Sequence, residues 1–181
     1  MEQAFRPEFN ESADAGLQPL RFNSIHMDNR FMARAISLSI ENVCTGSGGP
    51  FGCVVVHNAQ IIAEGANRVT ATNDPTAHAE IVAIRKACRE LGSFQLDDCE
   101  IYSSCEPCPM CLGAIYWARP ARLYFASTAE DAARAGFDDR FIYEQLEVAY
   151  ADRSIPMSQM MRQEAQEAFR LWTASNQRVD Y

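Results

Sequence analysis

Two stretches decide how this chain of 181 residues is read: His78-Ala79-Glu80 and Pro107-Cys108-Pro109-Met110-Cys111. One imidazole and two thiolates suit a zinc ion, and a catalytic zinc needs only three protein ligands plus a water. A carboxylate two residues after the histidine is better suited to moving protons than to joining a thiolate-rich ligand set. The stretches therefore predict one catalytic Zn²⁺ per subunit, held by His78, Cys108 and Cys111, with Glu80 beside it.

Both stretches lie where helices are predicted to begin. Asp74-Pro75-Thr76 opens an apolar pattern of helical period that Gly92 ends, and Pro107 or Pro109 opens a second helix that Pro120 ends. The free N–H groups at a helix N-terminus carry partial positive charge, which favours the thiolate that zinc binds. Side chains of a first turn can reach past the helix end toward one point, so we expect the three ligands to converge.

The rest of the pattern predicts an α/β fold, a three-layer α/β/α sandwich around a mixed five-stranded sheet. A helix begins at Asp28 and stops at the glycines of 46–49, and a helix over 161–175 carries Ala165, Ala168, Phe169 and Trp172 on one side. Alternating strands and helices imply parallel pairing after an initial hairpin, with helices on both faces. The predicted strands are 51–57, 61–63, 99–103, 123–126 and 155–160.

The chain is predicted to hold one domain, residues 25–181, that includes a C-terminal lid segment. Residues 1–24 show no sustained period and are expected to form a poorly ordered extension. They also lack the basic start and apolar block of a secretory signal. No apolar run approaches the roughly 20 residues that span a bilayer, so a cytoplasmic enzyme is expected.

The charge balance bears on the partners. The net charge is −8, and Lys86 is the single lysine among 16 basic residues. Binding a nucleic-acid backbone needs clustered Lys and Arg side chains, because neutralising phosphates supplies most of the non-specific affinity. The sequence therefore favours a small uncharged substrate and disfavours nucleic acid and membranes as partners.

The seven cysteines cannot all form disulfides within the chain, because their number is odd. Four of them are expected in the core, where free cysteine is a common small apolar residue: Cys44, Cys53, Cys88 and Cys99. Cys105 lies three residues before Cys108 and could supply a fourth ligand. A site with four protein ligands would be structural rather than catalytic, so this alternative stays open.

Longer segments around these motifs resemble a known superfamily. Residues 73–80 and 104–111 are similar to the cytidine and deoxycytidylate deaminases, and His-x-Glu with Pro-Cys-x-x-Cys is typical of zinc nucleobase deaminases. Residues 49–52, 113–120 and 135–139 and the terminal Tyr181 resemble the narrower guanine deaminase family. The resemblance, from about Asp28 to Tyr181, implies a cytidine deaminase-like fold. It also implies hydrolysis of guanine to xanthine and ammonia, in which zinc-bound hydroxide attacks the amine-bearing carbon and Glu80 shuttles the protons.

The resemblance also implies roles in binding the substrate. Asn67 would hydrogen-bond the purine and Phe51 would stack on it, with Trp117 in the same substrate-binding set. Asp139 would read the amino and ring N–H donors of guanine or assist proton transfer, although Asp138-Asp139 alone would be interpreted as a solvated turn. The family also implies a homodimer whose C-terminal segments are exchanged, so that Tyr181 closes the neighbouring site.

Three alternatives to guanine deamination remain. A guanosine deaminase would need room for a ribose where a C-terminal lid would lie. A tRNA adenosine deaminase is disfavoured by the acidic balance. A zinc-stapled binding module without catalysis would use Cys105 as its fourth ligand and would tolerate the loss of Glu80.

Overall fold

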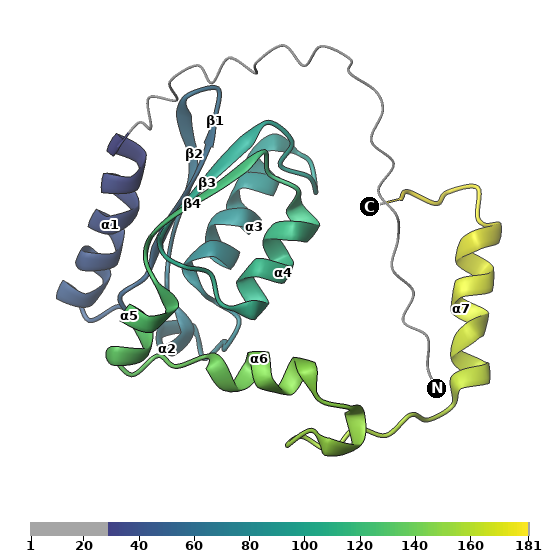
Figure 1. The fold of residues 1–181 in the computed structure, drawn as a ribbon. Helices are drawn as coiled ribbons and strands as arrows, with labels where there is room; N and C mark the ends of the chain where they lie inside the picture. Colours follow the sequence, from purple (N-terminus) through teal and green to yellow (C-terminus); the bar gives the residue numbers. More distant parts are fainter. Residues whose placement is uncertain (1–28, 181) are drawn as a thin grey trace, which may run out of the picture.

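The computed structural model describes residues 29–180, so the predictions for residues 1–24, Asp28 and Tyr181 lie outside the described residues. Its centre is a four-stranded sheet in the order β2-β1-β3-β4 (Figure 1). Strand β1 (Gly52–His57) pairs antiparallel with both β2 (Gln60–Ala66) and β3 (Cys99–Cys105). Strand β3 pairs parallel with β4 (Arg122–Ser127). The mixed sheet, the hairpin and the parallel later strands are confirmed.

The β1–β2 hairpin turns through Asn58 and Ala59, both of which have positive φ, at 51° and 58°. A two-residue hairpin turn of this type requires positive φ at both central residues, because the twist of such a turn matches the twist of the two strands. Asparagine tolerates a left-handed conformation, whereas alanine is strained there by its Cβ. The turn therefore forms despite an unfavourable residue at its second position.

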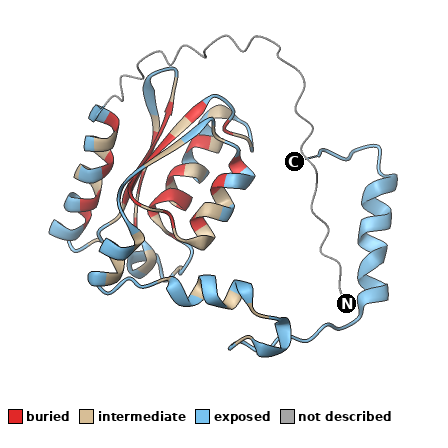
Figure 2. Cartoon of the chain, in the orientation of Figure 1, coloured by how far each residue is buried: buried red, intermediate tan, exposed pale blue. Residues whose placement is uncertain are grey.

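Helices cover both faces of the sheet, which confirms the three layers (Figure 2). Helix α1 (Asn29–Cys44) packs Phe31 and Ala35 on one face, against a cluster that includes Val54 and Tyr102. Gly52 permits this close approach, because a Cβ there would collide with the Ala35 carbonyl oxygen. Helices α3 (Ala79–Leu91) and α4 (Pro109–Ala118) cover the other face. They enclose the larger core cluster, which includes Cys53, Val55, Ala83, Ile101 and Ile115.

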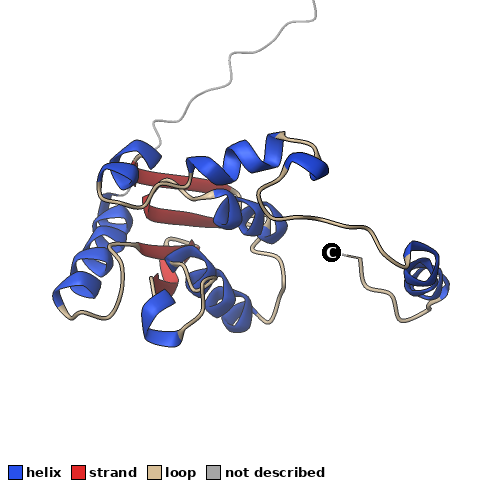
Figure 3. Cartoon of the chain, turned by 90° about the horizontal axis from the view of Figure 1, so that it is seen from below, coloured by secondary structure: helices blue, strands red, loops and turns tan. Residues whose placement is uncertain are grey.

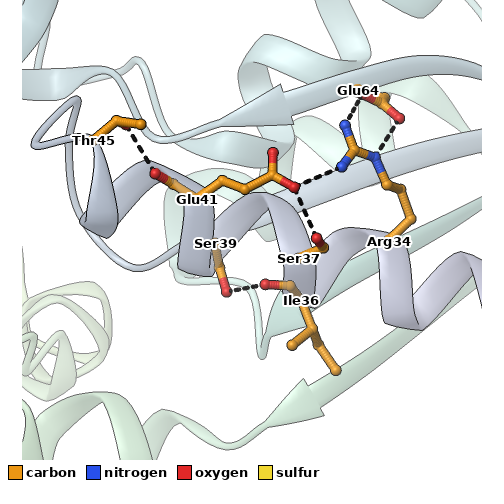
Figure 4. Close-up of polar contacts among 7 residues, drawn as sticks. All are labelled: Arg34, Ile36, Ser37, Ser39, Glu41, Thr45 and Glu64. Carbon is orange, nitrogen blue, oxygen red and sulfur yellow. Dashed lines mark hydrogen bonds and ion pairs between the residues drawn. The ribbon is translucent and has the colours of Figure 1, made fainter.

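A polar network fastens the edge strand β2 to both helical layers. The Arg34 guanidinium of α1 donates to the two carboxylate oxygens of Glu64, each at 2.8 Å, and to Glu41 at 3.0 Å (Figure 4). Ser37 donates to the same Glu41 oxygen at 2.8 Å. From the other layer, Lys86 of α3 donates to the Glu64 backbone carbonyl at 2.8 Å. Unpaired backbone groups at a sheet edge invite other strands, and the Lys86 ammonium occupies one backbone carbonyl of this edge strand.

The remaining helices are short or lie at the C-terminal end. They are α2 (Val69–Thr72), α5 (Ala129–Arg134), α6 (Arg140–Glu147), the 3₁₀ helix η1 (Tyr150–Asp152) and α7 (Arg162–Ala174). The sequence from Thr128 to Ala135, closed by Gly136, predicts a short helix that is confirmed as α5, and the helix expected over 161–175 is confirmed as α7. The sequence did not predict two further helices, α2 and α6.

Two sequence predictions are wrong. No strand forms at 155–160, so the described sheet has four strands rather than five. Ile155 is 77% exposed there, and a strand needs a neighbouring backbone to pair with, which this stretch lacks in the described chain. Cys44 is exposed at the end of α1 rather than in the core, whereas Cys53 and Cys99 are buried and Cys88 is half-buried.

Helix α7 stands apart from the sheet and the helices that cover it (Figures 1 and 3). All of its residues are exposed, including Phe169 and Trp172 on the side predicted to be apolar. Within the described chain this apolar side has no cover. None of the helices formed by residues 29–180 is long and apolar enough to cross a membrane.

Candidate functional site

The predicted zinc ligands converge where α3 and α4 begin. His78 is the N-cap residue of α3, Cys108 is the N-cap residue of α4, and Cys111 lies in the first turn of α4. Neither N-cap side chain bonds its own helix, which leaves both to face the same point. The three ligand atoms all lie within 4.8 Å of one another, with His78 Nδ1 3.5 Å from each sulfur. One nitrogen and two sulfurs at this spacing fit Zn²⁺.

The pKa values of the two cysteine thiols are shifted in opposite directions. The hydrogen bond from Cys111 lowers the pKa of Cys108 to about 4, with help from His78 and against the effect of burial. The same contact raises the pKa of Cys111, as do burial and the nearby Glu80. The hydrogen bond with Cys108 also raises the pKa of His78, although burial opposes it. The pair therefore gives up its first proton readily, and a thiolate is the form that a metal ion binds.

Glu80 lies directly beside this centre, in the first turn of α3. It is only 6% exposed, and burial is the main cause that raises the pKa of its carboxyl group. Its Oε1 accepts a hydrogen bond from Ser103 Oγ at 3.1 Å, and its Oε2 accepts one from Cys111 Sγ at 3.4 Å. A buried carboxyl group with a raised pKa exchanges protons nearer neutral pH, as a general acid and base must.

Cys105 does not join the ligand set. Its thiol donates to the Thr128 carbonyl at 3.6 Å, and burial raises its pKa to about 11. Over residues 29–180 one cluster of histidine, cysteine or acidic side chains has metal-binding geometry, and it contains only His78, Cys108 and Cys111. Three protein ligands leave the fourth position of zinc open, as in catalytic sites.

A cavity of about 490 Å³ opens onto the metal centre. Its walls include both Phe51 and Asn67, the predicted substrate contacts, together with Glu80, Glu106 and Phe137. The rings of Phe51 and Phe137 meet edge to face with centroids 5.0 Å apart. The lining contains two carboxylates and no lysine or arginine, so the cavity suits a neutral ligand that donates hydrogen bonds.

Asn67 is buried and anchored from both sides. Its carbonyl accepts a hydrogen bond from the Asn42 side chain at 2.9 Å, and its own Oδ1 accepts from the Val69 N–H at 3.2 Å. Gly48 allows this packing, because a Cβ there would collide with the Asn67 carbonyl oxygen. The amide of Asn67 is therefore presented to the cavity in a fixed position.

The other predicted contacts are placed differently. Asp139 is half-buried at the start of α6 and does not line the cavity, yet burial and the nearby charge of Cys108 raise its pKa. Trp117, near the end of α4, is 64% exposed and also lies outside the lining. Tyr181 is outside the described residues. The structure thus brings together the metal ligands, Glu80, Phe51 and Asn67, with Asp139 near enough to interact electrostatically.

Three residues of the site had no predicted role. Glu106 and Phe137 lie inside the segments 104–111 and 135–139 that resemble the family, and the buried Ser103 contacts Glu80. For Ser103 the strand period gave a signal, since a polar residue on the core side of a buried strand needs a partner. The sequence does not show that the partner is Glu80.

The comparisons with known proteins agree with this geometry. The profile of the family "Cytidine and deoxycytidylate deaminase zinc-binding region" matches residues 25–127. Guanine deaminase of Bacillus subtilis (strain 168) is 54% identical over 151 residues, which are 83% of this chain and 97% of that protein. An X-ray structure of guanine deaminase from Bacillus subtilis superposes with a TM-score of 0.83 at 53% identity, covering 84% of this chain and 98% of the other.

A tRNA deaminase is similar over a shorter part of the chain. A tRNA-specific adenosine deaminase of Agrobacterium fabrum (strain C58) is 46% identical over 78 residues, which are 43% of this chain and 51% of the relative. Because this relative is named for a different base, similarity over part of the chain does not by itself select the base that is deaminated.

Proposed function

Since the chain belongs to the cytidine and deoxycytidylate deaminase family, and within it to the guanine deaminases, we propose that it hydrolyses guanine to xanthine and ammonia. The observation that carries the proposal is the three-ligand zinc centre with Glu80 beside it, at the end of a cavity suited to a neutral base. The similarity to the Bacillus subtilis guanine deaminase over 97% of that protein adds the choice of base.

His78, Cys108 and Cys111 would hold one Zn²⁺ in this proposal, and the ion would supply a position at which bound water becomes acidic near neutral pH. Glu80 would receive one proton of the water and pass it to the ring nitrogen as the water oxygen bonds to the amine-bearing carbon. It would then move the remaining hydroxyl proton to the amine nitrogen, so that the C–N bond breaks, ammonia leaves and the carbonyl group of xanthine forms. Its raised pKa, caused mainly by burial, suits both steps, because the carboxyl group must take up a proton as well as release one.

The substrate contacts proposed from the family agree with the cavity in part. Phe51 stacks on the purine and the fixed amide of Asn67 hydrogen-bonds it, and both side chains line the cavity. Asp139 reads the amino and ring N–H donors or assists proton transfer in this proposal, and burial, followed by the charge of Cys108, raises the pKa of its carboxyl group. Trp117, which does not line the cavity, and Tyr181, which is outside the described residues, complete the proposed set.

Ammonia release tests the proposal directly. The zinc-loaded protein is offered guanine, guanosine, cytosine and adenosine side by side, and ultraviolet spectra identify the products. Xanthine from guanine alone is expected. Turnover of guanosine would support zinc-dependent deamination but contradict the proposal that a C-terminal lid closes the site. Release of ammonia from none of the four would contradict the proposal that the protein is an enzyme of this class.

Substitution of Glu80 separates an enzyme from a binding module. Glu80→Gln should keep zinc and fold and lower kcat by about a hundredfold or more, because the amide cannot carry the proton. Full activity in this variant would remove Glu80 from the mechanism. Metal analysis, thermal unfolding and steady-state kinetics are the measurements.

Cys105 separates a catalytic centre from a closed structural one. Cys105→Ala should keep one zinc per subunit, because its thiol bonds Thr128 rather than the ligand cluster. The matched variant Cys108→Ala should lose the zinc. Metal content after gel filtration gives the answer, and zinc loss from Cys105→Ala would instead support the structural site.

The assembly proposed from the family is a homodimer with exchanged C-terminal segments. The exposed apolar side of α7 supports it, since such a surface is normally covered. In the same proposal residues 25–181 form the deaminase domain, residues 177–181 close the partner's site, and residues 1–24 are an added extension. Deleting residues 177–181 should strongly impair turnover of guanine, and unchanged turnover would count against the lid. A cytoplasmic location stays a prediction from the sequence.

A further inference from the structure

Ser103 is a buried polar residue that none of the proposed steps uses. It lies in β3 opposite Cys53 of β1, is 2% exposed, and does not line the cavity. Its hydroxyl donates to Glu80 Oε1 at 3.1 Å. A serine at the centre of a sheet gives up the packing that an apolar side chain would provide, so the contact with Glu80 is the feature to explain.

The two oxygens of Glu80 have different partners. Oε1 faces the sheet and is held by Ser103, whereas Oε2 lies 3.4 Å from Cys111 Sγ, on the side of the metal cluster. A glutamate side chain has several rotatable bonds, and its terminal torsion is broad and shows no sharp preference. The hydrogen bond to Oε1 therefore limits the rotation that would turn Oε2 away from the metal centre.

We propose that Ser103 is the positioning residue for Glu80: its hydroxyl anchors Oε1 to the sheet so that Oε2 faces the reacting atoms. This inference rests on the proton-transfer role proposed for Glu80. Ser103 touches neither the substrate cavity nor the metal ligands in the described contacts, so it acts only through the carboxylate. A proton carrier that is misplaced by a fraction of a bond length loses rate without losing affinity for the substrate.

The neighbouring Ser104 provides a matched control. It is also buried, and as the next residue of the strand it projects to the opposite face. Its hydroxyl accepts the Gly52 N–H at 2.9 Å, a contact that joins β3 to β1. Ser104→Ala removes a buried hydroxyl from the same strand without touching Glu80, so it reports the general cost of such a loss.

The experiment compares the zinc-loaded variants on guanine. Ser103→Ala should lower kcat by about tenfold, the effect of losing one hydrogen bond to a charged acceptor, while KM stays within about twofold. Zinc content should remain at one ion per subunit. Ser103→Thr keeps the hydroxyl and should retain most of the rate. Ser103→Val, whose side chain has nearly the shape of threonine but no hydroxyl, should not. Ser104→Ala should lower the unfolding temperature and leave kcat near the parent value.

A double-mutant cycle shows whether the effect passes through Glu80. In the Glu80→Gln background, Ser103→Ala should change the residual rate by less than about twofold. An equal loss in both backgrounds, a loss of zinc, or a kcat that falls as much in Ser104→Ala would overturn the inference. The results distinguish a failure of the role proposed for Glu80 from a failure of the role proposed for Ser103. Full activity in Glu80→Gln removes the role of Glu80, whereas an inactive Glu80→Gln with a fully active Ser103→Ala removes only that of Ser103.

Discussion

At the scale of single residues, the backbone conformation at a position decides which contacts its side chain can make. His78 and Cys108 are N-cap residues whose side chains do not cap, and Ala59 adopts a left-handed backbone that its Cβ opposes. The first two positions leave ligand atoms free for a metal ion. The third is a strain that the hairpin tolerates.

The strain at Ala59 can be measured. Ala59→Gly should raise the free energy of unfolding by about 0.5–1 kcal/mol, because removing the Cβ relieves a left-handed residue by more than the added chain entropy costs. Urea unfolding monitored by circular dichroism checks the gain. Asn58→Gly is the control in the same turn and should gain less, since asparagine tolerates positive φ. A loss of stability in Ala59→Gly would mean that the turn is not strained.

The zinc ligands and Glu80 could be predicted at this scale because spacing and helix starts are local features of a sequence. Phe51 and Asn67 came from the resemblance, and both line the cavity, while their contacts with the substrate stay predictions. Ser103 and Phe137 could not be predicted, because their partners, Glu80 and Phe51, are distant in sequence and meet only in the folded chain.

At the scale of elements, side chains fasten one helix or strand to another across the site. Glu106 gives an example. Its Oε2 accepts the Ala129 N–H of α5 at 2.9 Å, and its own N–H donates to the Ser127 carbonyl at 2.8 Å. Helix α5 supplies Ala132 to the cavity wall and leads to Phe137. Glu106 thereby joins the segment that carries Cys108 to helix α5, which supplies part of the cavity wall.

Breaking this contact should disturb substrate binding. Glu106→Ala should raise KM for guanine by about tenfold, because the wall that carries Phe137 loses a hydrogen bond to a charged acceptor. Glu106→Gln retains an oxygen acceptor for the Ala129 N–H and should stay closer to the parent. Steady-state kinetics on zinc-loaded protein measures both. Equal losses in the two variants would assign the effect to the charge of Glu106 instead.

The Arg34–Glu64 pair predicts a dependence of stability on pH. Hydrogen bonding to Arg34 is the main cause that lowers the pKa of Glu64 in the folded state. A lowered pKa contributes stability above the unfolded value of about 4.3, and that stability is lost as pH falls through the folded value. Because both side chains are about one-third exposed, the contribution is only about 0.5–1 kcal/mol.

Glu64→Gln provides the measurement. The difference in unfolding free energy between the parent protein and this variant should be largest near neutral pH and should shrink below about pH 4. Urea titrations at several pH values check the trend. A difference that grows as the solution becomes more acidic would contradict the assigned sign.

The long helices could be predicted from sequence, whereas two of the short ones could not. Helices α1, α3 and α4 have an apolar period, or clear start and stop residues, that fixes them locally. The four residues of α2 and the eight of α6 form too few turns to give such a period. The stretch 155–160 has strand-like composition, yet pairing depends on a neighbour that composition cannot reveal.

At the scale of the whole molecule, helix α7 should be needed for assembly. Trp172→Glu places a charge on its exposed apolar side and should shift the proposed dimer toward monomer with loss of guanine turnover, since a charge is costly to bury at an interface. Gln163→Glu adds the same charge on the opposite side of the helix and should leave both unchanged. Light scattering coupled to gel filtration reports the mass. A variant at Trp172 that stays dimeric would remove α7 from the interface.

Lys86 is the only lysine in the sequence, and it lies within α3 with its ammonium bound to the edge of the sheet. A protease that cuts only after lysine therefore has one target, and cleavage would divide the chain into residues 1–86 and 87–181. The helix that carries this bond also carries Glu80 and begins at His78, so cutting requires the metal-binding helix to open first. The rate of cleavage after Lys86 would therefore report how often this helix opens locally. Comparing the rate with and without zinc would show how much the metal ion stabilises the helix.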